Sequence, residues 1–513
     1  MKEEVKRQMY TPTVDEVLEL RQTYNLIPIR YTFLADQVTP IQLYQTLRAD
    51  DTFLLESVEG GERWARYSFI GINPFQTVKT KDTTIEFTHR CGKTEKMEGN
   101  PLELLRSRIS HYRSPQDSQL PPFTGGAIGF LGYDTMQHIE KLPKPKKSSL
   151  QLPDIHMFFV DEVIAYDHLK QEVQVIVNLY VEEQANEGEI KSAYEQCCRR
   201  IMEIVKQMTE RSFSLQRVDN IPKSVEPIPV VSNISKETYL EMVRRGKEYI
   251  AAGDIFQVVL SQRFQAPAKS DPLFVYRILR VTNPSPYMYY FQTSDATVVG
   301  TSPELLVKVT GNKVDVRPIA GTRPRGSDQA EDERLREDLL ADEKERAEHL
   351  MLLDLGRNDV GRVSRFGSVE VSEQMVIELY SRVMHMVSHV SGRLAEGKDS
   401  FDALLSCFPA GTVSGSPKIR AMEIINELEQ ESRGIYAGAI GYFSFNGNLD
   451  SCIAIRTIVF QGGQAYVQAG GGIVADSIPE NEYEETRNKA RAMFHALSLA
   501  EQMMRVEEMS VDV

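Results

Sequence analysis

Apolar and polar residues along the chain follow two different periodicities. Between residues 30 and 180, short runs such as FLLES and VQVIVNLYV alternate with turns that contain glycine or proline, which predicts a region dominated by strands. Farther along, residues 333–356, 417–430 and 478–504 have helical patterns, whereas FQVVLSQRF, YMYYFQ, YAGAIGYFSF and CIAIRTIVF have the composition of strands. We therefore expect a mixed α/β (α+β) fold without internal repeats.

A segment with several prolines divides the chain. The stretch DNIPKSVEPIPVVSN, residues 219–233, cannot continue a helix, because proline lacks the backbone N–H and clashes with the preceding turn. It is followed by Ser235, a good N-cap, and by apolar residues at helical spacing. We expect an N-terminal region at 1–220, a linker at 221–234 and a C-terminal region at 235–513.

Composition and charge narrow the possible functions. The chain has 513 residues, and its 59 Lys and Arg against 73 Asp and Glu give a formal net charge of −14, which argues against general binding to nucleic acids or anionic membranes. The first thirty residues lack the apolar core of a secretory signal, and no apolar run approaches the roughly 20 residues of a membrane span. We expect a cytoplasmic protein that uses neither a membrane nor a nucleic acid.

The cysteines indicate reduced thiols. There are five, an odd number, without C-x-x-C pairs or histidines at the spacing of a zinc site. None lies in a Gly-x-Cys-x-Gly turn, so the sequence contains no candidate for a cysteine nucleophile.

Carboxylates near the C-terminus are the first candidates for a metal site. Ser477–Glu480 resembles a capping box with proline in the first turn, which predicts the start of a helix. Glu482 and Glu485 then share one helix face, and two carboxylates directed at one object suit Mg²⁺. The alternative is an exposed acidic face on which Glu485 pairs with Lys489. Glu348 could complete the site, or could belong to a solvated charged helix.

Two glycine-rich loops offer backbone N–H groups to an anion. They are Ala469–Gly472, after the strand AYVQ, and Ala410–Lys418, before a helix, and each could bind a carboxylate or be an ordinary turn. Neither matches the phosphate-binding loop G-x-x-x-x-G-K-[ST], so the sequence gives little support to an ATPase.

His385 and Arg456 are two further candidates. His385 lies between two methionines in SRVMHMVSHVSG, which is more typical of a core residue, although an imidazole can act as a general base near neutral pH. Arg456 lies inside the apolar segment CIAIRTIVF. A guanidinium buried in a strand needs a partner, either an internal carboxylate or the acid group of a substrate.

Taken in order, several segments resemble those of the chorismate-utilising enzymes. The resemblance covers about 28–170 and 235–495 and rests on GDIFQVVLSQRF, NPSPYMYY, TSPELL, PIAGTRPRG, EHLMLLDLGRNDVGR, FPAGTVSGSPK and AGGGIVADSIPENEYEETRNKA. Within that family the chain looks most like the anthranilate synthase large subunits. The resemblance implies an anthranilate-synthase-like fold, with large β-sheets packed with flanking helices, and a lyase that aminates chorismate and releases pyruvate.

The resemblance also implies roles for single residues. Glu348 and Glu485, with Glu482 nearby, would bind the Mg²⁺ that holds the ring carboxylate of chorismate. Tyr436 and Arg456 would hold its enolpyruvyl group. The other implied substrate contacts are Gln257, Gly321, Thr322, Gly470, Gly471, Gly472 and Lys418.

Three residues are implied to take part in the chemistry itself. Glu304 would protonate the departing C4 hydroxyl, which requires a carboxyl group with a raised pKa. His385 and Thr412 would act when the C2 proton is lost, His385 as the base or its helper and Thr412 by orienting the ring.

Two positions distinguish the reactions within the family. Gln257 stands where isochorismate and salicylate synthases carry a water-activating lysine, and an amide cannot act as that base. Ala320 stands where related aminodeoxychorismate synthases carry a nucleophilic lysine, and alanine cannot form the covalent adduct. We therefore expect direct attack of ammonia at C2. The closest alternative is an aminodeoxychorismate synthase component I that uses ammonia directly.

The resemblance implies two partners. A separate glutamine amidotransferase subunit would supply ammonia in a hetero-oligomer, because this chain lacks the cysteine turn of a glutaminase. L-tryptophan would bind as a feedback inhibitor through LLES and PYM motifs, at Ser57, Pro286, Tyr287 and Met288. These motifs could instead be a strand end packed on a proline turn. A second alternative is a catalytically silent subunit that only senses tryptophan.

Overall fold

The computed structural model describes residues 9–57, 66–209, 225–380 and 383–511, the last seven of these by their backbone only. Among these residues, the strands form two antiparallel sheets of 12 strands each. The first sheet contains, in order, β1 (Leu26–Leu34), β10 (Glu172–Tyr180), β9 (Glu162–Asp167), β3 (Tyr67–Gly71), β2 (Thr52–Glu56), β13 (Tyr287–Gln292), β14 (Thr297–Ser302), β23 (Thr457–Gln461), β24 (Gln464–Ile473), β12 (Gln257–Pro267) and β11 (Val231–Ser232), and β20 (Gly415–Ser416) also pairs with β12.

The second sheet lies against the first. Its order is β17 (Ile319–Pro324), β19 (Val383–Arg393), β16 (Lys313–Val316), β15 (Leu305–Thr310), β22 (Leu449–Ile453), β21 (Ala439–Ser444), β7 (Gly126–Leu131), β8 (Ile155–Val160), β4 (Gln76–Lys81), β5 (Thr84–His89) and β6 (Thr94–Glu98), and β18 (Glu370–Leu379) pairs with β19. The expected fold class of large sheets with flanking helices is confirmed.

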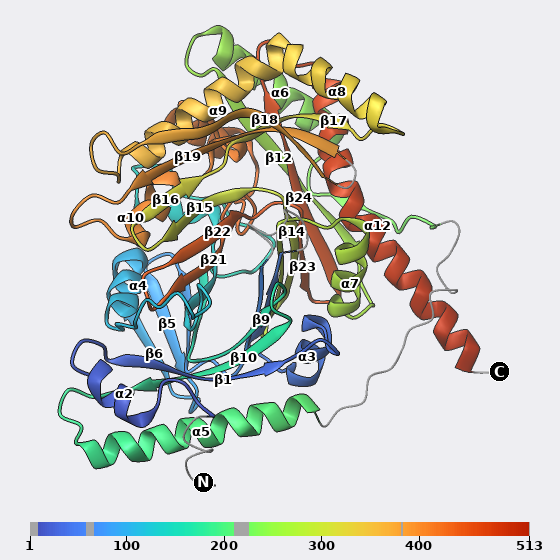
Figure 1. Ribbon diagram of the computed structural model, residues 1–513. Coiled ribbons are helices and arrows are strands. Elements are labelled where there is room, and N and C mark those ends of the chain that lie inside the picture. Colours follow the sequence, from blue (N-terminus) through green and yellow to red (C-terminus); the bar gives the residue numbers. More distant parts are fainter. Residues whose placement is uncertain (1–8, 58–65, 210–224, 381–382, 512–513) are drawn as a thin grey trace.

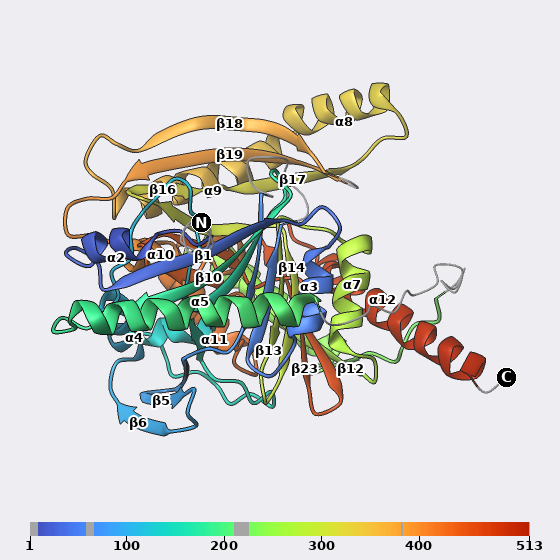
Figure 2. The same ribbon diagram turned by 60° about the horizontal axis from the view of Figure 1, so that its bottom comes forward.

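Helices cover the outer faces of both sheets. They are α2 (Val14–Leu20), α3 (Pro40–Leu47), α4 (Pro101–Ser110), α5 (Glu187–Thr209), α6 (Lys236–Ala251), α7 (Pro272–Thr282), α8 (Gln329–Ala341), α9 (Glu343–Gly361), α10 (Ser400–Cys407), α11 (Lys418–Leu428) and α12 (Pro479–Val511), with 3₁₀ turns η1 (Tyr133–His138) and η3 (Gly411–Val413). Helix α5 lies along β10 and β1, α9 along β17 and β19, and α12 along β24 (Figures 1 and 2). No described helix is both long and apolar enough to cross a membrane.

The core between the two sheets is rich in aromatic side chains. Phe69 of the first sheet meets Phe123 edge to face, with ring centroids 5.6 Å apart, and Phe123 lies 4.6 Å from Tyr442 of the second sheet. Phe53 and Phe158 extend the same cluster. Such pairs add geometric preference to the burial of apolar area, which favours one relative placement of the sheets.

Both sheets combine strands from either side of the 221–234 segment. In the first sheet β2 pairs with β13, placing Phe53 opposite Phe291. In the second, β7 pairs with β21. Part of that segment, 221–224, lies outside the described residues, and Val231–Ser232 forms the short edge strand β11.

Two sequence-based predictions of elements are wrong in the same way. The helix expected over 333–356 is two helices, because Asp342 leaves the helical conformation and its side chain accepts from the N–H groups of Lys344 and Glu345 to cap α9. CIAIRTIVF, expected as one strand, is the end of β22 in the second sheet and β23 in the first. The chain passes between the sheets at 454–456, where Arg456 has a φ of 49°.

The remaining elements agree with the sequence pattern. Strands β12, β13 and β21 and helices α11 and α12 lie where they were predicted. Helix α12 begins at Pro479, but the Ser477 hydroxyl accepts a hydrogen bond from the Val474 N–H at 3.0 Å. The predicted start of the helix is confirmed. This hydrogen bond of the serine hydroxyl stabilises the loop before the helix.

Candidate active site

A cavity of about 300 Å³ brings together most of the predicted site residues. Its walls come from β12 and β24 of the first sheet, β17 and β19 of the second, α9 and the η3 turn. We call it the first cavity. The predicted residues that line it are Gln257, Glu304, Thr322, Glu348, His385, Thr412, Tyr436, Arg456, Gly470 and Gly472.

The glycines of β24 make room for neighbouring polar side chains. A Cβ at Gly470 would lie 2.7 Å from the Tyr436 hydroxyl, and one at Gly472 would lie 2.7 Å from Nε2 of Gln257. Both distances are well below van der Waals contact, so a larger residue at either position would displace these side chains. The glycines are needed for close packing within the cavity wall.

Glu304 has the protonation behaviour of an acid that works near neutral pH. Burial raises the pKa of Glu304 to about 7. The nearby Thr412 hydroxyl and the positive charges of Lys489 and Arg456 oppose this rise in pKa. A carboxyl group that is still partly protonated at neutral pH can give its proton to a departing oxygen.

His385 faces the first cavity. The expectation that it is a core residue is wrong, because side chains alternate along β19: Met384 and Met386 are fully buried on the opposite face, while His385 lines the cavity. Its Nδ1 lies 3.0 Å from the Thr322 hydroxyl and 3.2 Å from the Gly321 carbonyl oxygen. Since a carbonyl can only accept, this contact favours a proton on Nδ1 and leaves the lone pair on Nε2.

Arg456 enters the cavity from the crossing between the sheets. It has a left-handed backbone conformation there, and its carbonyl accepts from the Thr301 N–H at 3.1 Å. Its side chain is half-buried in the cavity wall. The guanidinium is therefore not buried inside a strand, as the sequence pattern suggested, and is presented where an anionic ligand could reach it.

Of the three predicted metal ligands, Glu348 on α9 lines the first cavity, whereas Glu482 and Glu485 on α12 are not among its lining residues. Among the described residues, no three acidic, histidine or cysteine side chains converge closely enough to enclose a metal ion. Glu485 forms an ion pair with Lys489 at 2.7 Å, the alternative that the sequence left open. Lys489 also donates to the Gly470 carbonyl at 2.9 Å and lines the cavity.

The chemistry of these carboxylates nevertheless fits a hard dication. Oε2 of Glu482 is buried and has no hydrogen-bond partner among the described residues. Burial and the Glu485 charge raise the pKa of Glu482. Burial, Glu345 and Glu485 likewise raise the pKa of Glu348. Carboxylates that disfavour one another's charge gain from a cation between them, and oxygen donors suit Mg²⁺.

Three predicted contacts lie outside the lining of the first cavity. Gly321, at a bulge with φ of +70°, reaches it only through its carbonyl contact with His385. Gly471 faces α12, where a Cβ would lie 3.0 Å from Oε2 of Glu482. Lys418 forms an ion pair with Asp359 at 2.7 Å.

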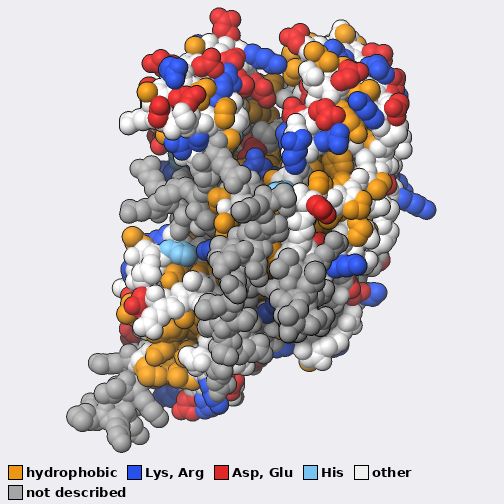
Figure 3. Space-filling view, turned by 90° about the vertical axis from the view of Figure 1, so that its right-hand side faces the viewer, with side chains coloured by type: hydrophobic (Ala, Val, Ile, Leu, Met, Phe, Trp, Pro, Cys, Tyr) orange, Lys and Arg blue, Asp and Glu red, His pale blue; other side chains and the backbone are white. Residues whose placement is uncertain are grey.

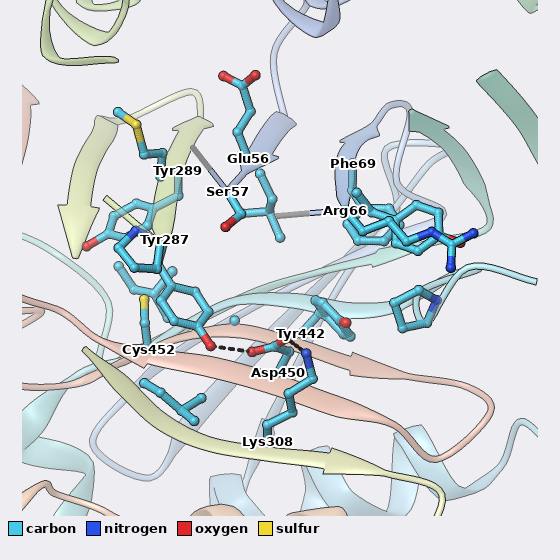
Figure 4. Close-up of a pocket in the computed structure, with 18 of the residues that line it drawn as sticks. Glu56, Ser57, Arg66, Phe69, Tyr287, Tyr289, Lys308, Tyr442, Asp450 and Cys452 are labelled. Atoms are coloured by element: carbon cyan, nitrogen blue, oxygen red, sulfur yellow. Dashed lines mark hydrogen bonds and ion pairs between the residues drawn. The ribbon is translucent and has the colours of Figure 1, made fainter. Parts of the chain in front are cut away.

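A second cavity, of about 380 Å³, is lined by the four residues predicted to bind tryptophan: Ser57, Pro286, Tyr287 and Met288. Figure 4 shows Ser57, directly after β2, and Tyr287, on the neighbouring strand β13, at one side of it and Arg66 and Phe69 across from them. The Met288 side chain belongs to the core on the other face of β13, so its contribution to the cavity comes chiefly from the backbone.

The polar groups of the second cavity are arranged in pairs. The Tyr287 hydroxyl donates to Asp450 at 2.9 Å, and Lys308 forms an ion pair with the other Asp450 oxygen at 2.9 Å (Figure 4). The Ser57 hydroxyl is buried and has no hydrogen-bond partner among the described residues. A cavity with aromatic walls and a few polar groups is typical of a small-molecule site.

Lys308 and Asp450 were missed in the sequence, although a signal was present. Each is the one charged residue within an otherwise apolar or small strand segment, LLVKVT or LDSCI, and β15 and β22 pair them directly. Lys489 was considered only as a surface partner of Glu485. Its role as a positive charge in the wall of the first cavity could not be inferred from helical spacing.

All five cysteines are free thiols. Burial raises the pKa of Cys197 and Cys407 to about 12 and that of Cys198 to about 11. Such thiols are poor nucleophiles, because the thiolate is the reactive form. This agrees with the absence of a cysteine turn in the sequence.

The surface on the α12 side mixes charges of both signs. Figure 3 shows acidic and basic side chains interspersed over two lobes with a hollow between them.

Residues 22–495 match the family model for chorismate binding enzymes. Anthranilate synthase component 1 from Acetivibrio thermocellus is 50% identical over 495 residues, 96% of this chain and 99% of that protein. The same component from Aquifex aeolicus is 46% identical over 493 residues, 96% and 98% of the two chains.

Solved structures show the same similarity in three dimensions. The crystal structure of anthranilate synthase component I from Streptococcus pneumoniae aligns with a TM-score of 0.72 and 39% identity, covering 90% of this chain and 99% of that one. The isochorismate synthase MenF from Escherichia coli aligns with a TM-score of 0.67 at 17% identity, covering 94% and 98%, a likeness of fold alone.

Proposed function

The chain belongs to the chorismate binding enzyme family, and from this premise we propose that it is a lyase of the anthranilate synthase component I type, which converts chorismate and ammonia to anthranilate, pyruvate and water. The observation that carries the proposal is the first cavity, which joins the acid Glu304, the base His385 and the cation Arg456 in one space. Gln257 and Ala320 line the same cavity in place of the lysines that sister activities require.

Substrate binding would use the charges of the wall. Arg456 would pair with the carboxylate of the enolpyruvyl group, and the Tyr436 hydroxyl, beside Gly470, would donate to the same group. Burial raises the pKa of Tyr436 to about 12, so this hydroxyl keeps its proton. The small residues of β24 let the ring approach the backbone.

The amination would need one proton donor. Ammonia forms the new bond at C2 while the C4–O bond breaks, and Glu304 gives its proton to the oxygen, which leaves as water. The half-protonated state of Glu304 near pH 7 supports this role. Without a lysine at position 320 or 257, neither a covalent adduct nor activation of water competes with ammonia.

The second step would need a base. Nε2 of His385 removes the C2 proton as the C3–O bond breaks, and the ring becomes aromatic. The enolate that leaves takes up a proton at its methylene carbon to give pyruvate. The contact of Nδ1 with the Gly321 carbonyl would fix the tautomer that allows this. Thr412, on the turn opposite, would orient the ring.

Mg²⁺ is proposed as the cofactor, held by Glu348 and Glu485 with Glu482 beside them. When bound, the cation would supply positive charge to hold the ring carboxylate of chorismate. The unpartnered Glu482 oxygen and the raised pKa values of Glu348 and Glu482 support this assignment. Glu485 would have to leave Lys489, so the ion pair between them would compete with the metal.

Ammonia is proposed to come from a glutamine amidotransferase subunit in a hetero-oligomer. The support is that none of the five cysteines lies in the Gly-x-Cys-x-Gly turn of a glutaminase. Burial also raises the pKa of four of the thiols, those of Cys197, Cys198, Cys407 and Cys452, so that little of the reactive thiolate is present. The proposed reaction would begin L-tryptophan biosynthesis, and a cytoplasmic location is part of this proposal.

L-tryptophan is proposed to bind in the second cavity as a feedback inhibitor. Ser57 offers a hydroxyl that has no hydrogen-bond partner among the described residues, and Tyr67, Phe69 and Tyr442 offer aromatic surface for an indole ring. Pro303 and Ile319 line both cavities, so a ligand in the second would press on a wall of the first.

The deciding experiment uses the purified chain alone with chorismate, Mg²⁺ and an ammonium salt. Anthranilate fluorescence follows the rate, and mass spectrometry identifies the product. Anthranilate that disappears on adding EDTA or tryptophan is the expected result. Aminodeoxychorismate or isochorismate would assign a sister activity, and absence of turnover with tryptophan binding intact would favour a sensing subunit.

A further inference from the structure

A buried arginine lies behind the wall of the first cavity, in contact with three of its parts. Arg433 and Glu429 are 3% and 5% exposed, and they form a double hydrogen bond, Nε to Oε2 at 2.9 Å and Nη2 to Oε1 at 2.6 Å. Neither residue lines the first cavity. Burying an ion pair is costly, and the cost is offset only where further hydrogen bonds complete the arrangement.

The further hydrogen bonds of Arg433 go to the cavity wall. Nη1 donates to the Val413 carbonyl at 2.6 Å, and Nη2 donates to the Val259 carbonyl at 2.7 Å. Val413 follows Thr412 directly, and Val259 is two residues from Gln257 on β12. The guanidinium also lies 5.6 Å from the centre of the Tyr436 ring. One planar group thus contacts the η3 turn, β12 and the tyrosine.

Glu429 extends the arrangement to a fourth part of the wall. Its Oε1 accepts from the Ser261 N–H at 2.8 Å and the Ser261 hydroxyl at 2.9 Å. Nε2 of Gln468, a residue of the cavity lining on β24, donates to the same hydroxyl at 2.9 Å. The ion pair therefore joins β12, β24, the η3 turn and the segment that carries Tyr436.

We propose that Arg433, held by Glu429, is a positioning residue for the proposed reaction. It fixes the positions of Thr412, Gln257 and Tyr436 relative to one another without touching substrate. The inference rests on the proposed function. Lysine cannot replace the arginine, because one ammonium cannot donate in the fixed directions of the planar guanidinium while facing an aromatic ring. Small displacements of catalytic groups have large effects on rate, since they lose alignment in the transition state.

Arg433→Lys tests the proposal, with Arg200→Lys as the matched control. Arg200 also forms a double hydrogen bond with a buried carboxylate, Glu162, at 2.9 Å for both contacts, but it lies on α5 at the outer face of the first sheet. Rates with ammonium are measured well below the melting temperature of each variant. We expect Arg433→Lys to lower kcat/KM for chorismate roughly tenfold or more, and Arg200→Lys to leave it unchanged.

A second variant separates positioning from stability. The effect of Arg433→Lys is also measured in a Tyr436→Phe background, where we expect it to shrink, because residues that act through one another are not additive. If Arg433→Lys does not fold, Glu429→Gln, which keeps the shape but weakens the pair, replaces it in the same cycle. Unchanged kcat/KM in a folded variant, or full additivity with Tyr436→Phe, would overturn the inference. If the unaltered chain makes no anthranilate, it is the proposed function that fails.

Discussion

Nζ of Lys489 lies 2.7 Å from Oε1 of Glu485 and forms an ion pair with it. A residue proposed to bind magnesium is therefore already paired with a lysine of the same helix. Lys489 also lines the first cavity, so the ion pair lies beside its wall. A divalent cation shared with Glu348 and Glu482 would replace Lys489 as the partner of the Glu485 carboxylate.

Glu485→Gln is therefore expected to abolish magnesium-dependent turnover, because one ligand charge is lost. The initial rate of anthranilate formation is titrated with Mg²⁺, and a fall of roughly 100-fold or more is expected. Glu484→Gln is the matched control, since Glu484 is the exposed residue directly before Glu485 on α12 and pairs with Arg487 at a longer distance of 3.3 Å. Normal turnover of Glu485→Gln would remove this residue from the metal site.

Glu304 is expected to set the alkaline side of the pH profile. A general acid must be protonated, so the rate at a constant concentration of free ammonia should fall as the pH rises through the pKa of Glu304, about 7 in the chain without ligand. Bound chorismate, which is an anion, would move this limb to higher pH. In Glu304→Gln, most of the rate should be lost, and the remaining rate should no longer fall as the pH rises. If the variant keeps the normal rate and the same fall with pH, another group donates the proton.

The same residue should make the protein less stable at high pH. Because the pKa of Glu304 is raised on folding, its favourable contribution is present below the ordinary carboxyl pKa and is lost as the pH rises through about 7. Glu304→Gln should then raise the melting temperature at about pH 8 but not at about pH 4. Equal shifts at both pH values would mean that the carboxyl is not desolvated.

Gly470→Ala is expected to impair chorismate binding while the fold persists. The added methyl would lie 2.7 Å from the Tyr436 hydroxyl and 3.0 Å from the Leu260 carbonyl, and the tyrosine is the group that can move. We expect KM for chorismate to rise roughly tenfold or more, from steady-state kinetics. Gly361→Ala, where a Cβ would meet nothing within 4 Å, should leave KM unchanged.

Ser57→Phe is expected to abolish tryptophan inhibition without loss of turnover. The phenyl ring would fill part of the second cavity beside the end of β2, and Ser57 is not among the residues that line the first cavity. Inhibition is measured by the ammonium-dependent rate and binding by calorimetry. Tryptophan inhibition as strong as in the unaltered chain would place the inhibitor elsewhere.

The sequence located most of the helices and strands correctly, but it did not show where tertiary contacts interrupt an element. The helix and strand patterns located α11, α12, β12 and β13 correctly, because each has a single apolar face or a continuous apolar run. Periodicity could not detect the break at Asp342, where a side-chain cap replaces a helical turn, or the crossing at Arg456 between two sheets. Both errors arise where tertiary contacts override a locally continuous pattern.

In the candidate site, too, the sequence identified individual residues but not which side chains face a cavity or pair with one another. The alternation of β19 decides that His385 faces the first cavity and its neighbouring methionines do not, but the sequence cannot say which face of a strand is the core. Motifs identified Glu304, Thr412 and Arg456. The second cavity's Lys308 and Asp450 become partners only through strand pairing across a long separation.

The way the sheets interleave the two parts of the chain also constrains its synthesis. Strands β2 and β7 leave the ribosome long before their partners β13 and β21 are made. Until then each sheet has an open edge, which can pair with another nascent chain. Completion of the folded enzyme must therefore follow translation of nearly the whole polypeptide, and a product truncated at the proline-rich segment would be prone to aggregate.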